Sequence, residues 1–246
     1  MMKKRKNILF LIIKFFVRIF YKKMKIEGLE NLPDEPCILV GNHAQANGPI
    51  IGELYFSKNT YMWCNSEVMN LKEAPSYAMK DFFPYKHKSV RWFYKLLSYI
   101  IAPLCCLIFK NARTIAVYRD SRIISTFKHT VNYLKEGNNI IIFPECSDDH
   151  NEIINEFQEN FIDVAKLYYK RTNKELMFVP FYNCPSLKKV VIGKPIKFNI
   201  NNDFIEEKQM MISYFKNEIT NIAKQLPAHR VVPYKNISKK EYPMSK

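Results

Sequence analysis

The sequence places Asn42 and His43 directly after a short apolar run at residues 37–40. A strand that ends in a polar turn leaves its last side chains at the edge of a sheet, where a rigid backbone holds an imidazole beside a cleft. Histidine titrates near neutral pH and exchanges protons with a substrate, so His43 is a candidate general base. The alternative is that His43 only forms hydrogen bonds within its turn.

Three further segments place polar or turn-forming residues at predicted strand ends: Arg119, Phe143-Pro144-Glu145 and Val179-Pro180. Because the carboxyl ends of parallel strands meet at one edge, we expect His43, Arg119 and Glu145 to converge on one crevice. The planar guanidinium of Arg119 suits phosphate, since it donates paired charge-assisted hydrogen bonds. The alternatives are a surface ion pair between Arg119 and Asp120 and a solvated turn at Glu145.

The strands and helices that must position these residues alternate along the chain. We expect strands at 24–28, 37–40, 60–64, 114–118, 139–143, 176–181 and 189–192, and helices from Pro49 and at 121–137, 153–169 and 206–226. This alternation predicts an α/β fold with a mixed, mostly parallel sheet flanked by helices. No linker or repeat divides the sequence, so we expect a single domain at residues 26–227, followed by a loose basic tail at 228–246.

The amino-terminal residues 1–25 carry nine basic groups and no acid, within a net charge of +15. Lys14, Arg18 and Lys22 recur every four residues in an apolar stretch, which places them on one stripe of a helix. This pattern predicts an amphipathic helix in the headgroup region of an anionic membrane. The charges interrupt the stretch, which argues against a signal or spanning segment. An ordinary buried helix is the remaining alternative.

A second apolar run extends from Trp92 to Phe109, broken by Lys95 and Pro103. We expect a core helix with partial membrane contact, kinked or ended at the proline. The basic charge also suggests nucleic acid, but the sequence lacks basic strands interleaved with aromatic residues and a recognition helix. We therefore expect an anionic membrane surface as a partner, and no nucleic acid.

The six cysteines show neither Cys-x-x-Cys pairing nor a histidine at ligand spacing. We expect reduced thiols, a cytoplasmic compartment, no metal site and no cofactor.

Taken in order, the four segments resemble the glycerolipid acyltransferase family, which includes the bacterial lysophosphatidic acid acyltransferases. The family's Asn-His-x4-Asp, arginine, Phe-Pro-Glu-Gly and Val-Pro motifs have counterparts in Asn42-His43, Arg119, Phe143-Pro144-Glu145 and Val179-Pro180, and the similarity extends from about Ile26 to Ile196. The resemblance implies transfer of a fatty acyl group from acyl-CoA or acyl-carrier protein to a hydroxyl of a glycerolipid-type acceptor.

The same resemblance implies His43 as the base and Arg119 as the ligand of an acceptor phosphate, with Glu145 anchoring the acceptor or orienting its loop. It implies a peripheral enzyme at the cytoplasmic face of the cell membrane. The expected substrate-binding residues are Asn42, Gln45, Arg119, Phe143, Pro144 and Glu145.

Gly48 stands where the family has its aspartate. Such a carboxylate fixes the imidazole tautomer and stabilises the imidazolium. Asn47 can orient His43 through its amide oxygen, so we place Asn47 with His43 as the catalytic residues, and Gln45 is a second candidate for that task. The acids Glu145, Asp120, Asp148 and Asp149 remain alternatives.

The segment Cys146-Ser147-Asp148-Asp149 also departs from the family's Gly-Thr-Arg-Ser. Its two acids repel phosphate, which indicates an acceptor with less phosphate than lysophosphatidic acid or a different entry. These departures keep open an alternative function, a catalytically silent lipid-binding protein on the same scaffold.

Overall fold

The computed structural model describes residues 7–56, 59–81, 83, 87–151 and 153–246. The chain divides into two compact units. Unit 1 comprises residues 1–22 and 63–126, and unit 2 comprises residues 23–62 and 127–246. The single α/β domain predicted at 26–227 contains residues of both units. The units are described separately below.

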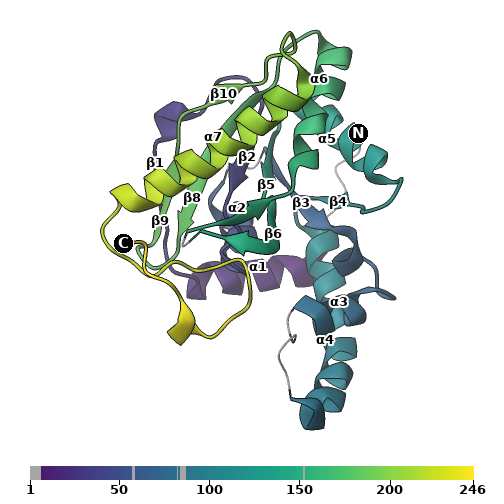
Figure 1. Ribbon diagram of the computed structural model, residues 1–246. Coiled ribbons are helices and arrows are strands. Elements are labelled where there is room, and N and C mark those ends of the chain that lie inside the picture. The colour runs from purple at the N-terminus through teal and green to yellow at the C-terminus, as the bar shows by residue number, and fades with distance from the viewer. Residues whose placement is uncertain (1–6, 57–58, 82, 84–86, 152) are drawn as a thin grey trace. The chain divides into compact units, whose positions relative to one another are not determined.

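Unit 2 is built on a mixed, mostly parallel sheet, which confirms the predicted fold class (Figure 1). Its strands lie in the order β1 (Lys25–Glu27), β9 (Lys189–Ile192), β8 (Met177–Cys184), β2 (Cys37–Gly41), β5 (Asn139–Ile142) and β3 (Thr60–Asn65), whose last three residues belong to unit 1. Strand β2 is parallel to β5 and β8, β3 is parallel to β5, and β1 is parallel to β9. Strands β9 and β10 (Ile196–Lys197) are antiparallel to β8.

The central strand β2 is buried at all five residues, as an apolar strand covered on both faces should be. Its register pairs Val40 with Ile142 of β5 and with Pro180 of β8. The three strands therefore end at the same edge, and the turns that follow β2 and β5 meet there.

Four helices accompany this sheet: α2 (Asn47–Tyr55), α5 (Ile123–Lys135, which begins in unit 1), α6 (Val164–Thr172) and α7 (Phe204–Gln225). Helix α7 lies along one face of the sheet over β8 (Figure 1). It begins at Asp203, whose carboxylate accepts hydrogen bonds from the backbone N–H groups of Ile205 and Glu206. Short 3-10 helices occur at Leu29–Asn31, Ser66–Met69, Lys88–Val90, Glu159–Asp163 and Lys239–Glu241.

The prediction of a helix at 153–169 is wrong over its first half. Strands β6 (Glu145–His150) and β7 (Asn155–Phe157) form an antiparallel ribbon there. The side-chain oxygen of Asn151 accepts hydrogen bonds from the backbone of Ile153 and Ile154, which fixes the turn between the two strands. This local turn overrides the helical spacing of the apolar residues.

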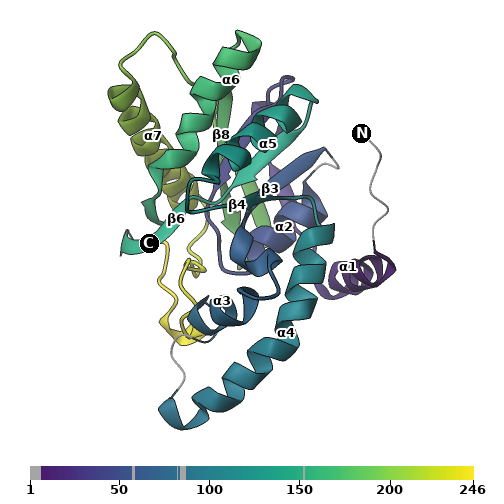
Figure 2. The ribbon, with the colours of Figure 1, turned by 90° about the vertical axis from the view of Figure 1, so that its right-hand side faces the viewer.

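Unit 1 contains α1 (Ile8–Phe20), α3 (Ala74–Asp81), α4 (Arg91–Asn111) and β4 (Thr114–Val117). The amino-terminal helix is confirmed, and it begins at Asn7, whose side chain accepts a hydrogen bond from the N–H of Leu9. The N–H of Asn7 in turn donates to Oδ1 of Asn111, which joins α1 to the end of α4. Helices α3 and α4 pack together, as Figure 2 shows.

Helix α4 continues through Pro103 rather than ending there. Among the described residues, Lys88–Asn111 is the one helical segment long and apolar enough to cross a membrane, and only 17% of its most apolar stretch is buried. Both α1 and α4 expose large apolar side chains: Ile8, Leu9, Leu11, Ile12, Phe15, Phe16, Ile19 and Phe20 on α1, and Trp92, Phe93, Leu96, Tyr99, Ile100 and Leu104 on α4.

The carboxy-terminal residues 227–246, which we call the C-terminal strap, are packed onto unit 2 rather than forming the loose arm expected for 228–246. An antiparallel bridge joins Arg230 to Met244, and the N–H of Val231 donates to the carbonyl of Pro243. His229 and Ser245 are buried at the base of the strap.

Candidate active site

A tight turn carries His43 from β2 into α2. Ala44 and Gln45 adopt left-handed backbone conformations with φ of 48° and 54°, which residues other than glycine rarely adopt. The turn closes where the N–H of Gly48 donates to the carbonyl of His43 at 2.9 Å. Such strained residues persist only where their surroundings fix them, and they cluster at functional sites.

Glu145 fixes this turn from the neighbouring strand end. Its Oε2 accepts the backbone N–H of His43 at 2.5 Å, and its Oε1 accepts the N–H of Asn155 at 3.1 Å. The structure thus brings His43 and Glu145 together, as the order of the parallel strands predicts. In these contacts Glu145 holds the backbone of His43.

The carboxyl of Glu145 is almost fully buried. Burial raises its pKa to about 7, although its two backbone N–H donors act in the opposite direction. The carboxylate that shapes the His43 turn therefore titrates close to neutral pH.

Two aromatic rings contact the imidazole. The ring centroid of Phe143 lies 5.2 Å from that of His43 at an interplanar angle of 64°, and that of Tyr234 lies at 5.6 Å and 89°. Both are edge-to-face arrangements. Nδ1 of His43 is buried, so Nε2 is the nitrogen that a substrate would approach.

Asn42 is buried against Asn183 of β8. Its Oδ1 accepts the N–H of Asn183 at 2.6 Å, and its Nδ2 donates to the carbonyl of Asn183 at 3.0 Å. The side chain of Asn183 returns a hydrogen bond to the carbonyl of Asn42 at 2.8 Å. Asn42 was expected to bind substrate, but these contacts make it part of the framework beneath His43.

The two amides proposed to orient His43 both form hydrogen bonds that hold the turn or the C-terminal strap. Nδ2 of Asn47 donates to the carbonyl of Ala44 at 2.9 Å, which supports the turn. Nε2 of Gln45 donates to the carbonyl of Lys235, and its Oε1 accepts the hydroxyl of Tyr242. Gln45 is therefore bound to the C-terminal strap.

Gly48 has no space for a side chain. A Cβ atom there would lie 2.3 Å from the carbonyl oxygen of His43 and 3.1 Å from the ring of Phe143. The tight turn, which brings residue 48 against the histidine backbone, requires glycine at this position.

Pro144 is buried, and its carbonyl accepts the N–H of Gln158. The side chains of Asp148 and Asp149, two of the acids considered as partners for His43, lie outside the described part of the structure.

Arg119 lies in unit 1, exposed in the loop after β4. The carboxylate of Asp120, which the alternative interpretation pairs with Arg119, is bound by Arg122 at 2.7 Å. Asp120 therefore forms its ion pair with Arg122 rather than with Arg119.

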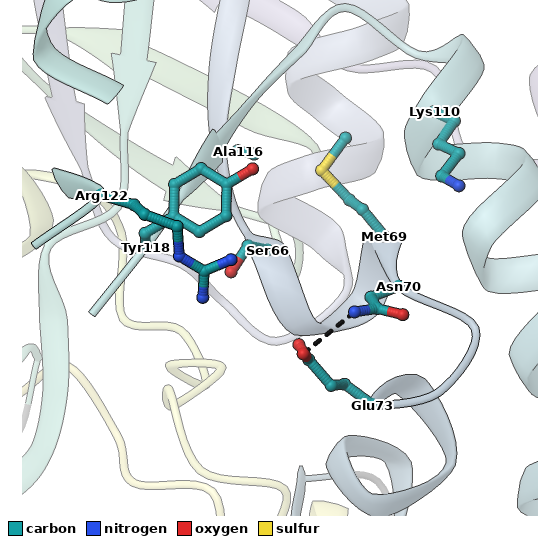
Figure 3. A pocket seen from close by; sticks show the side chains of 8 residues that line it. All are labelled: Ser66, Met69, Asn70, Glu73, Lys110, Ala116, Tyr118 and Arg122. Atoms are coloured by element: carbon teal, nitrogen blue, oxygen red, sulfur yellow. Dashed lines mark hydrogen bonds between the residues drawn. The ribbon is translucent and has the colours of Figure 1, made fainter. Parts of the chain in front are cut away.

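Unit 1 also contains an open pocket of about 280 Å³ beside this loop, lined by Ser66, Met69, Asn70, Glu73, Lys110, Ala116, Tyr118 and Arg122 (Figure 3). The guanidinium of Arg122 lies over the ring of Tyr118, 4.4 Å from its centroid. Nδ2 of Asn70 donates to Glu73. Sequence reasoning did not single out these residues, because their positions carry no motif.

The described residues contain no group of three or more His, Cys, Asp or Glu side chains able to hold a metal ion. The six cysteines are free thiols, as expected.

These features define an α/β protein with a histidine fixed at the carboxyl edge of a mostly parallel sheet. The acyltransferase family model matches residues 23–182, well over half of the chain, and the chain therefore belongs to this family. The match contains all four motifs, which confirms the resemblance found in the sequence. It ends before the C-terminal strap.

Among solved structures, the chain is similar to the 1-acyl-sn-glycerophosphate (LPA) acyltransferase PlsC from Thermotoga maritima. The two share 17% identity with a TM-score of 0.49, over 87% of this chain and 79% of that chain. No curated protein matches the sequence significantly.

Proposed function

We propose that this protein transfers a fatty acyl group from acyl-CoA or acyl-carrier protein to a hydroxyl of a glycerolipid-type acceptor, with His43 as general base. The observation that carries the proposal is the fixed His43 turn at the sheet edge, within the part of the chain that belongs to the acyltransferase family. A base is needed because a neutral hydroxyl is a poor nucleophile, and a positioned base contributes about 10²–10⁴-fold.

In the proposed reaction, His43 takes the proton of the acceptor hydroxyl while its oxygen bonds to the thioester carbonyl carbon. The tetrahedral intermediate then breaks its carbon–sulfur bond. The imidazolium returns the proton to the departing sulfur, which leaves as a thiol and restores neutral His43. If Nε2 is the base, the neutral ring must carry its proton on the buried Nδ1.

Arg119 is the proposed ligand of an acceptor phosphate. Its exposure after β4 and the engagement of Asp120 by Arg122 support this assignment, since the nearest acid in sequence already has a cation. An arginine fork matches phosphate oxygens in pairs.

We further propose that unit 1 holds the enzyme on the cytoplasmic face of the cell membrane as a peripheral protein. Helix α1 carries Lys14 and Arg18 beside large exposed apolar side chains, and α4 exposes a second apolar surface in the same unit. Apolar burial and attraction of cations to anionic lipid act together at such a surface.

The lack of a carboxylate at Gly48 favours a second candidate function, a silent lipid-binding protein. One experiment separates the two. Purified protein in phosphatidylglycerol vesicles is given radiolabelled palmitoyl-CoA or palmitoyl-acyl-carrier protein with a panel of lysophospholipids, some lacking a free phosphate monoester.

The proposed function predicts acyl transfer to at least one acceptor and a loss of at least about 100-fold in His43→Ala. Full transfer by His43→Ala would refute His43 as the base. Lipid binding without transfer to any acceptor, with either donor, would support the silent protein instead.

A further inference from the structure

We infer that the C-terminal strap acts on the active site through one residue, Tyr234, which is a positioning residue for His43. This inference rests on the proposed role of His43 as the base. It concerns residues beyond the family match, which ends at residue 182.

The strap is a closed loop fastened at its base. The bridge between Arg230 and Met244 brings its two ends together. Beneath this bridge, the N–H of Ser245 donates to the carbonyl of His229 at 3.0 Å, and the hydroxyl of Ser186 donates to the carbonyl of Arg230 at 2.7 Å. Loops with adjoining ends that pack through their own side chains are compact and frequently functional.

The imidazole of His229 anchors this base to the sheet. The hydroxyl of Tyr182, on β8, lies 2.9 Å from Nε2, and the carbonyl of Pro227 lies 2.7 Å from Nδ1. The carbonyl of Pro227 can only accept, so Nδ1 carries a proton, and the hydroxyl of Tyr182 can donate to Nε2. Nδ1–H then donates to Pro227, which satisfies both ring nitrogens in the neutral form.

The far part of the loop is fastened to the catalytic turn by Gln45. Its amide nitrogen donates to the carbonyl of Lys235 at 2.8 Å, and its amide oxygen accepts the hydroxyl of Tyr242 at 2.9 Å. Of the two strap residues in these bonds, Lys235 precedes the 3-10 helix at Lys239–Glu241 and Tyr242 follows it. Both bonds also hold Gln45 in its left-handed conformation, so the turn and the strap stabilise each other.

Tyr234 is placed by these fastenings, one residue before Lys235, and its ring meets the ring of His43 edge to face. An imidazole that contacts both Tyr234 and Phe143 cannot turn freely about its χ2 bond. In related catalytic sites a carboxylate limits this rotation, but position 48 has no room for one. In this chain, packing against Tyr234 supplies the orientation that the missing carboxylate would give.

The test combines spectroscopy with kinetics on the full-length protein. Long-range proton–nitrogen correlation of ¹⁵N-labelled histidine reports the tautomers of the His43 ring, with His43→Ala used for assignment. The variants are Tyr234→Ala, which removes the ring, and Tyr234→Phe, which keeps it. Tyr234→Leu keeps the bulk without the ring and serves if the alanine variant does not fold. Ile237→Ala, in the same loop, is the matched control.

We expect the two ring nitrogen shifts of His43 to move toward each other in Tyr234→Ala, because a ring that turns about χ2 no longer keeps the same nitrogen buried and the tautomers then mix. We also expect kcat for palmitoyl transfer to fall about three- to tenfold, which corresponds to the interaction energy of one aromatic pair. KM should change less than about twofold. Tyr234→Phe, which keeps the ring, should stay closer to wild type than Tyr234→Ala in both measurements, and Ile237→Ala should match wild type.

Wild-type His43 shifts and wild-type kcat in Tyr234→Ala, beside an inactive His43→Ala, would overturn this inference and leave the proposed function intact. A rise in kcat would also overturn it, because the strap would then obstruct the site. Full activity in His43→Ala would instead refute the proposed function.

Discussion

Oε2 of Glu145 accepts the backbone N–H of His43 at 2.5 Å, and this contact holds the turn that carries the proposed base. A second backbone donor, the N–H of Asn155, ties the same carboxylate to strand β7. The Phe-Pro-Glu motif therefore joins the turn after β2 to strand β7, and a buried carboxyl fixes the position of the proposed base, His43.

The first prediction concerns the pH dependence that this carboxyl introduces. Because burial raises its pKa to about 7, its contribution to stability is present below about pH 4.5 and is lost as the pH rises through about 7. Glu145→Gln should remove this contribution, which is on the order of 3 kcal/mol. Thermal unfolding at pH 5 and pH 8 measures it: the fall in Tm should be larger in wild type than in the variant. Glu159→Gln, an exposed carboxyl nearby, should keep the wild-type difference.

A second prediction follows from the crowding around Gly48. Gly48→Asp, which would restore the family's aspartate, should lower the free energy of unfolding by about 1–3 kcal/mol and should not raise acyl transfer, because its Cβ would clash with the carbonyl of His43. Ala46→Asp places the same carboxylate in solvent at the start of α2, where it should be tolerated. Urea unfolding and transfer assays compare the two. Faster transfer by Gly48→Asp would show that the turn can open to accept a side chain.

The sequence predicted the sheet well because β2, β5 and β8 are apolar runs buried on both faces, and such runs need no long-range information to recognise. It predicted the meeting of His43 with Glu145 for the same reason, since parallel strand ends share an edge. It failed at the β6–β7 ribbon because a single side chain, that of Asn151, determines the turn.

The strap was not predictable from local pattern. Its polar, basic composition is typical of a loose tail, and its structure depends on contacts with residues far away in sequence. Tyr182 and His229 are 47 residues apart, and Gln45 and Tyr242 are 197 residues apart. No spacing rule connects such pairs. The sequence therefore predicted that Gln45 binds substrate, and it predicted no role for Tyr234.

A third prediction concerns Asn42. Asn42→Ala leaves the buried N–H and carbonyl of Asn183 without the side chain that now pairs with both. Because an unsatisfied buried polar group costs about 1–3 kcal/mol, we expect a loss of about 2–4 kcal/mol in the free energy of unfolding. Urea unfolding should show a lower midpoint with an unchanged slope. Asn201→Ala, at an exposed asparagine, is the control, and equal losses in the two variants would contradict a framework role for Asn42.

The last prediction tests the membrane surface of unit 1. Phe16→Glu on α1 and Ile100→Glu on α4 each put a charge on an exposed apolar face and should weaken binding to phosphatidylglycerol vesicles about tenfold or more. Ile205→Glu alters an equally exposed apolar residue in unit 2 and should leave binding unchanged, because unit 2 is not proposed to enter the lipid. Vesicle flotation measures binding for all three variants.

The cations of α1 should contribute to the same binding. Lys14→Gln and Arg18→Gln should each weaken binding about fivefold at low salt and less at high salt, since screening removes the attraction to anionic lipid. Equal losses in Ile205→Glu, or binding unaffected by Phe16→Glu and Ile100→Glu, would show that the two exposed faces of unit 1 do not form the membrane surface.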